Sequence, residues 1–220
     1  MRTLTLLLVM MVGISSAEAQ VKRLYQNTKL PSQQMVEKQT FTNPIVASAT
    51  TLSSAAAGPT SAAAASITSF SAQPDMPRNI VITPGGTTGD IENCTITVSG
   101  TNIQNASISE DFVFLADATG AVTGNKAFKT VSSVSFPANC ESGGFAATWD
   151  IGIGSKLGVK YCMESAGHIF FSTLNGAKEA TAPTMAASSS AVGSNTATFN
   201  GTLNGSNDFE LFFIQNFKCL

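Results

Sequence analysis

The chain has 220 residues, of which 43% are hydrophobic and only 12% charged, whereas about 25% is typical. Its formal net charge is −2, and no cluster of Lys and Arg is available to neutralise a row of phosphates, which argues against nucleic-acid binding. Low charge with many Ser, Thr, Asn and Gly residues is common in extracellular and virion β-proteins.

The first residues have the pattern of an export signal. Arg2 gives a positive start, Leu4 to Ile14 is an apolar run, and Ala17-Glu18-Ala19 has the small-x-small pattern of a cleavage site. The pattern predicts a signal peptide over residues 1–19, cleaved between Ala19 and Gln20. The alternative is an apolar start created by a misassigned initiation codon. The run is too short for a stable membrane span, which needs roughly 20 apolar residues.

Two segments without regular secondary structure are expected next. Residues 20–46 are polar with scattered apolar positions and predict an irregular arm, which is either a disordered leader or an arm that wraps a neighbouring subunit. Residues 47–72 are almost entirely Ala, Ser and Thr, and Gly58-Pro59 interrupts any helix there. A low-complexity Ala/Ser/Thr-rich linker is the simpler prediction.

Residues 73–220 predict an all-β module, an antiparallel sandwich of Ig-like or jelly-roll-like type. Short runs rich in Val, Ile, Phe and Thr are separated by Gly, Asn, Asp and Pro. In Cys94-Thr95-Ile96-Thr97-Val98 the apolar residues alternate, so they share one core-facing side. The expected strands are 78–83, 94–99, 108–115, 126–136, 145–151, 157–163, 168–174, 196–203 and 209–217.

Two features near the end of the chain bear on topology. Asn204-Gly205 predicts a tight hairpin between the last two strands. The run 209–217 carries four Phe residues and is too apolar for a free sheet edge, where it would invite association. We expect it to be a central strand or part of a subunit interface.

Catalytic signals are weak. His168 is the chain's single histidine, and no G-x-S-x-G motif accompanies it, so an ordinary strand histidine is expected. The run Gly152 to Gly158 matches neither phosphate-binding spacing and predicts a β-turn. An exported hydrolase would depend on His168 and scattered acids alone.

Two acidic pairs, Asp90 with Glu92 and Glu110 with Asp111, are the candidates for metal binding or glycosidase chemistry. Neither has calcium-loop spacing, and adjacent strand residues point to opposite faces. No catalytic, metal-binding or cofactor-binding residue is therefore assigned, and no cofactor is expected.

The four cysteines are Cys94, Cys140, Cys162 and Cys219. They lack zinc-type C-x-x-C spacing, and an even number after an export signal favours at least one disulfide, with three connectivities open. Four reduced core thiols are the alternative if there is no export signal.

Several short motifs occur in a distinctive order: Gln73-Pro74-Asp75-Met76-Pro77-Arg78-Asn79-Ile80, Val98-Ser99-Gly100-Thr101, Gly124-Asn125-Lys126-Ala127-Phe128-Lys129-Thr130-Val131 and Lys156-Leu157-Gly158. On these motifs, residues 71–220 resemble tailed-phage virion structural proteins with head-decoration or related roles. The resemblance implies a β-sandwich subunit that binds a capsid or another virion surface and reinforces it.

The expected function is therefore a non-catalytic structural virion protein, most simply a capsid decoration or head-associated subunit. Its expected partners are other virion subunits such as the major capsid protein, and further copies of itself. The alternative is an exported bacterial β-sandwich, secreted or periplasmic after signal cleavage, that binds a cell-surface or carbohydrate ligand.

Overall fold

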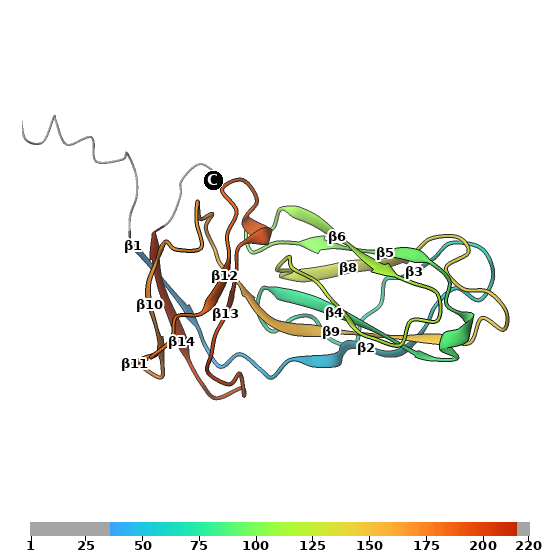
Figure 1. Ribbon diagram of the computed structural model, residues 1–220, viewed down its shortest axis with the longest axis horizontal. Coiled ribbons are helices and arrows are strands. Elements are labelled where there is room, and N and C mark those ends of the chain that lie inside the picture. The colour runs from blue at the N-terminus through green and yellow to red at the C-terminus, as the bar shows by residue number, and fades with distance from the viewer. Residues whose placement is uncertain (1–35, 215–220) are drawn as a thin grey trace, which may run out of the picture. The chain divides into compact units, whose positions relative to one another are not determined.

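The computed structural model describes residues 36–214, which form strands, two short 3-10 turns and loops. The predicted all-β, antiparallel sandwich architecture is confirmed (Figure 1). No helix in the described part of the chain is long and apolar enough to cross a membrane. The elements are β1 Val36–Phe41, β2 Ser48–Ala57, β3 Ala65–Ile67, β4 Arg78–Gly86, η1 Thr88–Asp90, β5 Cys94–Thr101, β6 Ser107–Phe114, β7 Val122–Thr123, β8 Thr130–Phe136, β9 Ala147–Gly158, β10 Ile169–Leu174, β11 Ala177–Lys178, β12 Thr184–Ala186, η2 Val192–Ser194, β13 Thr196–Thr198 and β14 Phe209–Ile214.

The first core lies between two sheets (Figure 1). One sheet has the order β3-β8-β5-β6, and the other contains β9, β4 and β7, with β2 also pairing with β9. The stripe predicted on β5 is confirmed, because Ile96 and Val98 are fully buried and Cys94 is nearly so. Trp149 of β9 packs edge-on against Phe114 of β6, with ring centroids 5.1 Å apart. Such aromatic pairs add to the hydrophobic stabilisation of a core.

A second core lies beneath the sheet of order β1-β14-β10-β11. The strand β14 alternates, with Phe209, Leu211 and Phe213 buried in this core. It lies between β1 and β10, so the expectation of a central strand is confirmed for the described residues 209–214. Residues 215–217 of the predicted strand lie outside the described residues.

The long strand β9 contributes to both cores. Trp149, Ile151 and Ile153 are buried in the first core, whereas Leu157 belongs to the second. The prediction of two strands, 145–151 and 157–163, separated by a β-turn at residues 152–158 is therefore wrong. A side chain at Gly152 would meet the backbone of Ser48 and Ala49 in β2, so glycine here permits close strand approach and does not mark a turn.

The predicted linker also needs correction. Within residues 47–72, Ser48–Ala57 forms β2 on β9, and Ala65–Ile67 forms β3 on β8. The end of the predicted irregular arm, residues 36–41, is β1. These strands were not recognised because small and hydroxyl side chains pair without burying an alternating apolar stripe; in β2 only Leu52 is fully buried. The folded module therefore begins before residue 73.

The predicted hairpin at Asn204-Gly205 is wrong in topology. The preceding strand β13 pairs with β12 and β9, not with β14. The tight hairpin is instead at Asn175-Gly176, between β10 and β11, where both residues have positive φ angles of 50° and 80°. This is the backbone that Asn-Gly favours in a two-residue hairpin loop. Two further predicted strands are shorter, since 126–136 begins at Thr130 and 196–203 ends at Thr198.

Candidate functional site

The motifs that carry the resemblance meet around the buried side chain of Asn79. Its Oδ1 accepts a 2.9 Å hydrogen bond from the backbone N–H of Lys156, and its Nδ2 donates to the carbonyl of Gly124 at 3.1 Å. The Lys156 Nζ donates to the same carbonyl. Three motifs far apart in sequence are thus joined by one amide.

The first of these motifs also fixes neighbouring segments. Arg78 is fully buried and donates to the carbonyls of Gly154 and Ile45 and to Asp75 Oδ1, the last at 2.7 Å. Gln73 exchanges two hydrogen bonds with the backbone of Val131. These contacts give the motif residues structural roles at the junction of several strands.

The histidine considered for catalysis lies just before β10. Its backbone N–H donates to Ser165, and its carbonyl accepts from Ile214 at 2.8 Å. The side-chain Nδ1 is buried without a hydrogen-bond partner, whereas a catalytic triad needs an acid at that nitrogen. His168 therefore adjoins a strand without the partner that a triad requires.

The side chains of the two acidic pairs accept hydrogen bonds from neighbouring loops and strands. Asp90 Oδ2 accepts from the backbone of Ala146, and Glu92 Oε1 accepts from the Ser142 hydroxyl. Glu110 accepts from the backbone of Lys126, whereas Asp111, on the other side of the strand, accepts from a threonine hydroxyl. Among residues 36–214, no group of three or more His, Cys, Asp or Glu side chains is arranged to hold a metal ion.

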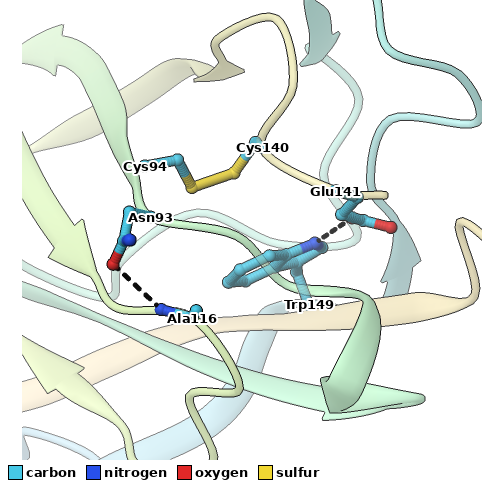
Figure 2. Close-up of a disulfide and its surroundings, with 6 residues drawn as sticks. All are labelled: Asn93, Cys94, Ala116, Cys140, Glu141 and Trp149. Atoms are coloured by element: carbon cyan, nitrogen blue, oxygen red, sulfur yellow. Dashed lines mark hydrogen bonds between the residues drawn. A yellow bond between two sulfur atoms is a disulfide. The ribbon is translucent and has the colours of Figure 1, made fainter. Parts of the chain in front are cut away.

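The cysteines within residues 36–214 are disulfide-bonded, as the sequence favoured. Cys94 and Cys140 are bonded to each other, with Cα atoms 5.1 Å apart (Figure 2). Cys162 is also disulfide-bonded. Cys219 and the predicted cleavage position at Ala19 and Gln20 lie outside the described residues.

A buried carboxyl group next to the first disulfide was missed by the sequence analysis. Glu141 is only 1% exposed, and its Oε1 accepts a 2.8 Å hydrogen bond from Trp149 Nε1. The other oxygen, Oε2, is buried without a hydrogen-bond partner. Figure 2 shows one carboxylate oxygen directed away from the indole. Nothing in the local sequence marks this glutamate as buried.

Burial raises the pKa of Glu141 above its ordinary value. The cause is that a charged carboxylate is costly to remove from water. The hydrogen bonds from Trp149 and from the backbone N–H of Ala147 oppose this effect, and the negative charge of Asp90 adds to it. Gly58 packs directly against both Glu141 and Trp149, in the segment that leads from β2 to β3.

Glu141 lines a surface cavity of about 450 Å³, which we call the loop cavity. None of the described residues that line it is Lys, Arg or His. Three lining residues, Asn139, Gly143 and Phe145, have positive φ angles, so the loop between β8 and β9 turns sharply where it lines the cavity. The lining side chains that carry polar or aromatic groups are Glu92, Asn93, Asn139, Glu141, Ser142 and Phe145.

A second surface feature is the outward side of the β1-β14-β10-β11 sheet. Directly paired residues share a side, which places Val36 beside Ile214 and Phe171 beside Phe212. The rings of Phe171 and Phe212 stack at 4.3 Å, and Val36 is 58% exposed. Phe170, at the adjacent register irregularity, is 54% exposed. We call these five residues the apolar face.

Charges on the same side of this sheet are already engaged. Lys38 forms a 2.7 Å ion pair with Glu210 across β1 and β14. The Nζ of Lys178 lies 5.8 Å from the centre of the Phe171 ring, within the range of a cation–π contact. The apolar face is therefore bordered by charged groups that already have partners within the same sheet.

No protein family, no curated protein and no solved structure matches this chain.

Proposed function

We propose that this chain is a non-catalytic structural virion protein, a capsid decoration or head-associated subunit that attaches to a virion surface. The observation that carries the proposal is the apolar face, with its stacked Phe171 and Phe212 and the exposed Val36 and Phe170. Contiguous exposed apolar surface of this kind is characteristic of protein–protein contact sites. The short motifs that occur in the same order as in phage virion proteins suggest that the partner is another virion protein.

The size of this surface favours a repetitive partner. The three six-residue strands β1, β14 and β10, about 4.8 Å apart, give an outward side of roughly 300 Å², below the roughly 800 Å² per partner of a stable complex. One such contact binds weakly. An oligomer that presents several copies to a regular protein lattice gains affinity through multivalency. A capsid supplies such a lattice.

Cosedimentation with capsids tests the proposal. The purified protein, wild type or Phe212→Ser, is mixed with capsids formed by the major capsid protein encoded beside this gene. Wild type should pellet with the capsids, and F212S should bind at least about tenfold more weakly, because it removes a partly buried aromatic anchor. Val113→Ser, an exposed apolar residue on β6, is the matched control and should bind as wild type.

Several outcomes would contradict the proposal. These are a gene without portal, protease and major-capsid genes beside it, wild-type protein that stays in the supernatant, and equal losses in F212S and V113S. Thermal unfolding of each variant separates a lost contact from a lost fold.

The second candidate is an exported bacterial β-sandwich that binds a cell-surface or carbohydrate ligand. The disulfides favour it, since the Cys94–Cys140 bond and the bonded Cys162 suit an oxidising compartment. A glycan array probed with the oxidised protein tests this candidate. Selective binding of one glycan class, lost in F212S, would favour it over the virion role, whereas an empty array would count against it.

A further inference from the structure

The loop cavity is lined by a carboxyl group, that of Glu141, of which the fold leaves one oxygen unpaired. Glu141 is only 1% exposed, and its Oε2 has no hydrogen-bond partner. An unpaired buried polar group destabilises the fold, and a charged one does so more strongly. Its other oxygen is taken by Trp149, and Gly58 closes that side. A ligand that donates a hydrogen bond to Oε2 would remove this cost.

From this geometry we propose that the loop cavity binds a primary ammonium group, as carried by a lysine side chain or a free alkyl amine. An ammonium has three donors and no acceptor. Glu92 and Glu141 supply carboxylate oxygens, and the Asn139 amide and Ser142 hydroxyl are further acceptors in the same lining. The absence of Lys, Arg and His among the described lining residues leaves this acidic lining without a cation.

An organic cation fits this arrangement better than a metal ion. A metal needs several oxygens at about 2.0–2.6 Å from one point, and the described residues offer no such convergence of three side chains. An ammonium reaches acceptors at about 2.7–2.9 Å and tolerates a wider spread. Its alkyl chain also requires apolar surface, which the Phe145 ring provides in the same cavity. This site is independent of the proposed attachment through the apolar face.

The single tryptophan of the chain makes the test direct. The Trp149 indole N–H bonds to Glu141, so its NMR resonance reports on the carboxyl group of the site. The probes are Nα-acetyl-lysine N-methylamide, 1,4-diaminobutane and, as the neutral control, the Nε-acetylated form of the first. We expect the resonance to shift and saturate with a charged amine, in the millimolar range of a single surface ion pair, and to ignore the neutral control. Tighter binding of the lysine mimic indicates a polypeptide ligand; tighter binding of the diamine indicates a free one.

Variants assign the shift to the cavity. Glu92→Gln and Glu141→Gln should each weaken binding about tenfold, the loss expected for one hydrogen bond to a charged group. Asn139→Asp adds a carboxylate to the lining and should tighten binding, which keeps the test decisive if E141Q folds poorly. Asp111→Asn on β6 is the matched control and should bind as wild type. An indole resonance that stays unmoved up to about 50 mM amine, well above that range, would overturn the proposal. So would equal shifts with the neutral control.

Discussion

The indole N–H of Trp149 donates a 2.8 Å hydrogen bond to Oε1 of Glu141, and both side chains are buried. This pair connects β9 to the segment that follows Cys140, so the only tryptophan of the chain holds a carboxyl group inside the protein. A buried carboxyl with one oxygen unpaired makes stability depend on its protonation.

Replacing Glu141 by Gln should remove this pH dependence. Because the folded pKa of Glu141 is raised above its ordinary value of 4.5, the protonated carboxyl stabilises the fold at low pH. That contribution is complete below the unfolded pKa and is lost as the pH rises through the folded one. Gln keeps an acceptor for Trp149 and does not titrate. Urea unfolding from pH 4 to 8 should therefore show wild type losing stability relative to E141Q as pH rises.

The comparison needs a carboxyl control in a different environment. Asp111 is exposed on β6 and accepts a hydrogen bond from Thr97, which Asn can retain. Relative to Asp111→Asn, wild type should therefore not lose stability as the pH rises from 4 to 8. If the stability of wild type relative to E141Q stays constant or rises with pH, the pKa of Glu141 is not raised in the folded protein.

Loss of the Cys94–Cys140 bond should destabilise the first core. The bond closes a separation of 46 residues, for which the chain-entropy model gives about 4 kcal/mol. The double variant Cys94→Ala/Cys140→Ala should lose about that free energy of unfolding in urea. Non-reducing peptide mapping of wild type should recover Cys94 with Cys140 and Cys162 with Cys219, the one pairing then left among four cysteines. Recovery of any other pair would contradict the assignment.

Local patterns predicted the strands that bury an alternating apolar stripe. The stripe at Cys94, Ile96 and Val98 was predictable because one side of a single strand carries it. The position of β14 followed from its Phe content. In contrast, β2 buries only Leu52 completely, so its strand character depends on pairing with β9, about a hundred residues later. The sequence around β2 therefore gives no sign of the strand with which it pairs.

Glycine and Asn-Gly signals were ambiguous for the same reason. Asn175-Gly176 and Asn204-Gly205 satisfy the same turn rule, but only the first joins two strands that pair. At the second, the N–H of Gly205 donates to the distant carbonyl of Pro44. The burial of Glu141 likewise depends on Trp149 and on Gly58, more than eighty residues earlier. The candidate site was thus not predictable from local sequence, whereas the sandwich class was.

The buried Arg78 should not tolerate a conservative exchange. Its guanidinium donates to Ile45, Asp75 and Gly154, and the single ammonium of Lys cannot reproduce this fork of donors. Arg78→Lys should cost about 3 kcal/mol, as in other buried ion pairs that are broken. Lys38→Arg on β1 is the control, since it makes the reverse exchange at a side chain that is about half exposed. It should leave urea unfolding unchanged. Equal stabilities of R78K and wild type would show that the Arg78 hydrogen bonds are dispensable.

Glycine at position 152 should be required for β2 to pair with β9. A Cβ there would overlap the carbonyl oxygen of Ser48 and the backbone of Ala49, and backbone cannot yield as the tip of a flexible side chain can. Gly152→Ala should therefore cost about 3 kcal/mol, the upper part of the range for overpacking. It should also speed amide hydrogen exchange in β2 selectively. Gly120→Ala is the matched control, because a Cβ there meets nothing within 4 Å, and it should change stability by less than about 0.5 kcal/mol. If both variants unfold at the same urea concentration, β2 does not lie against Gly152 in solution.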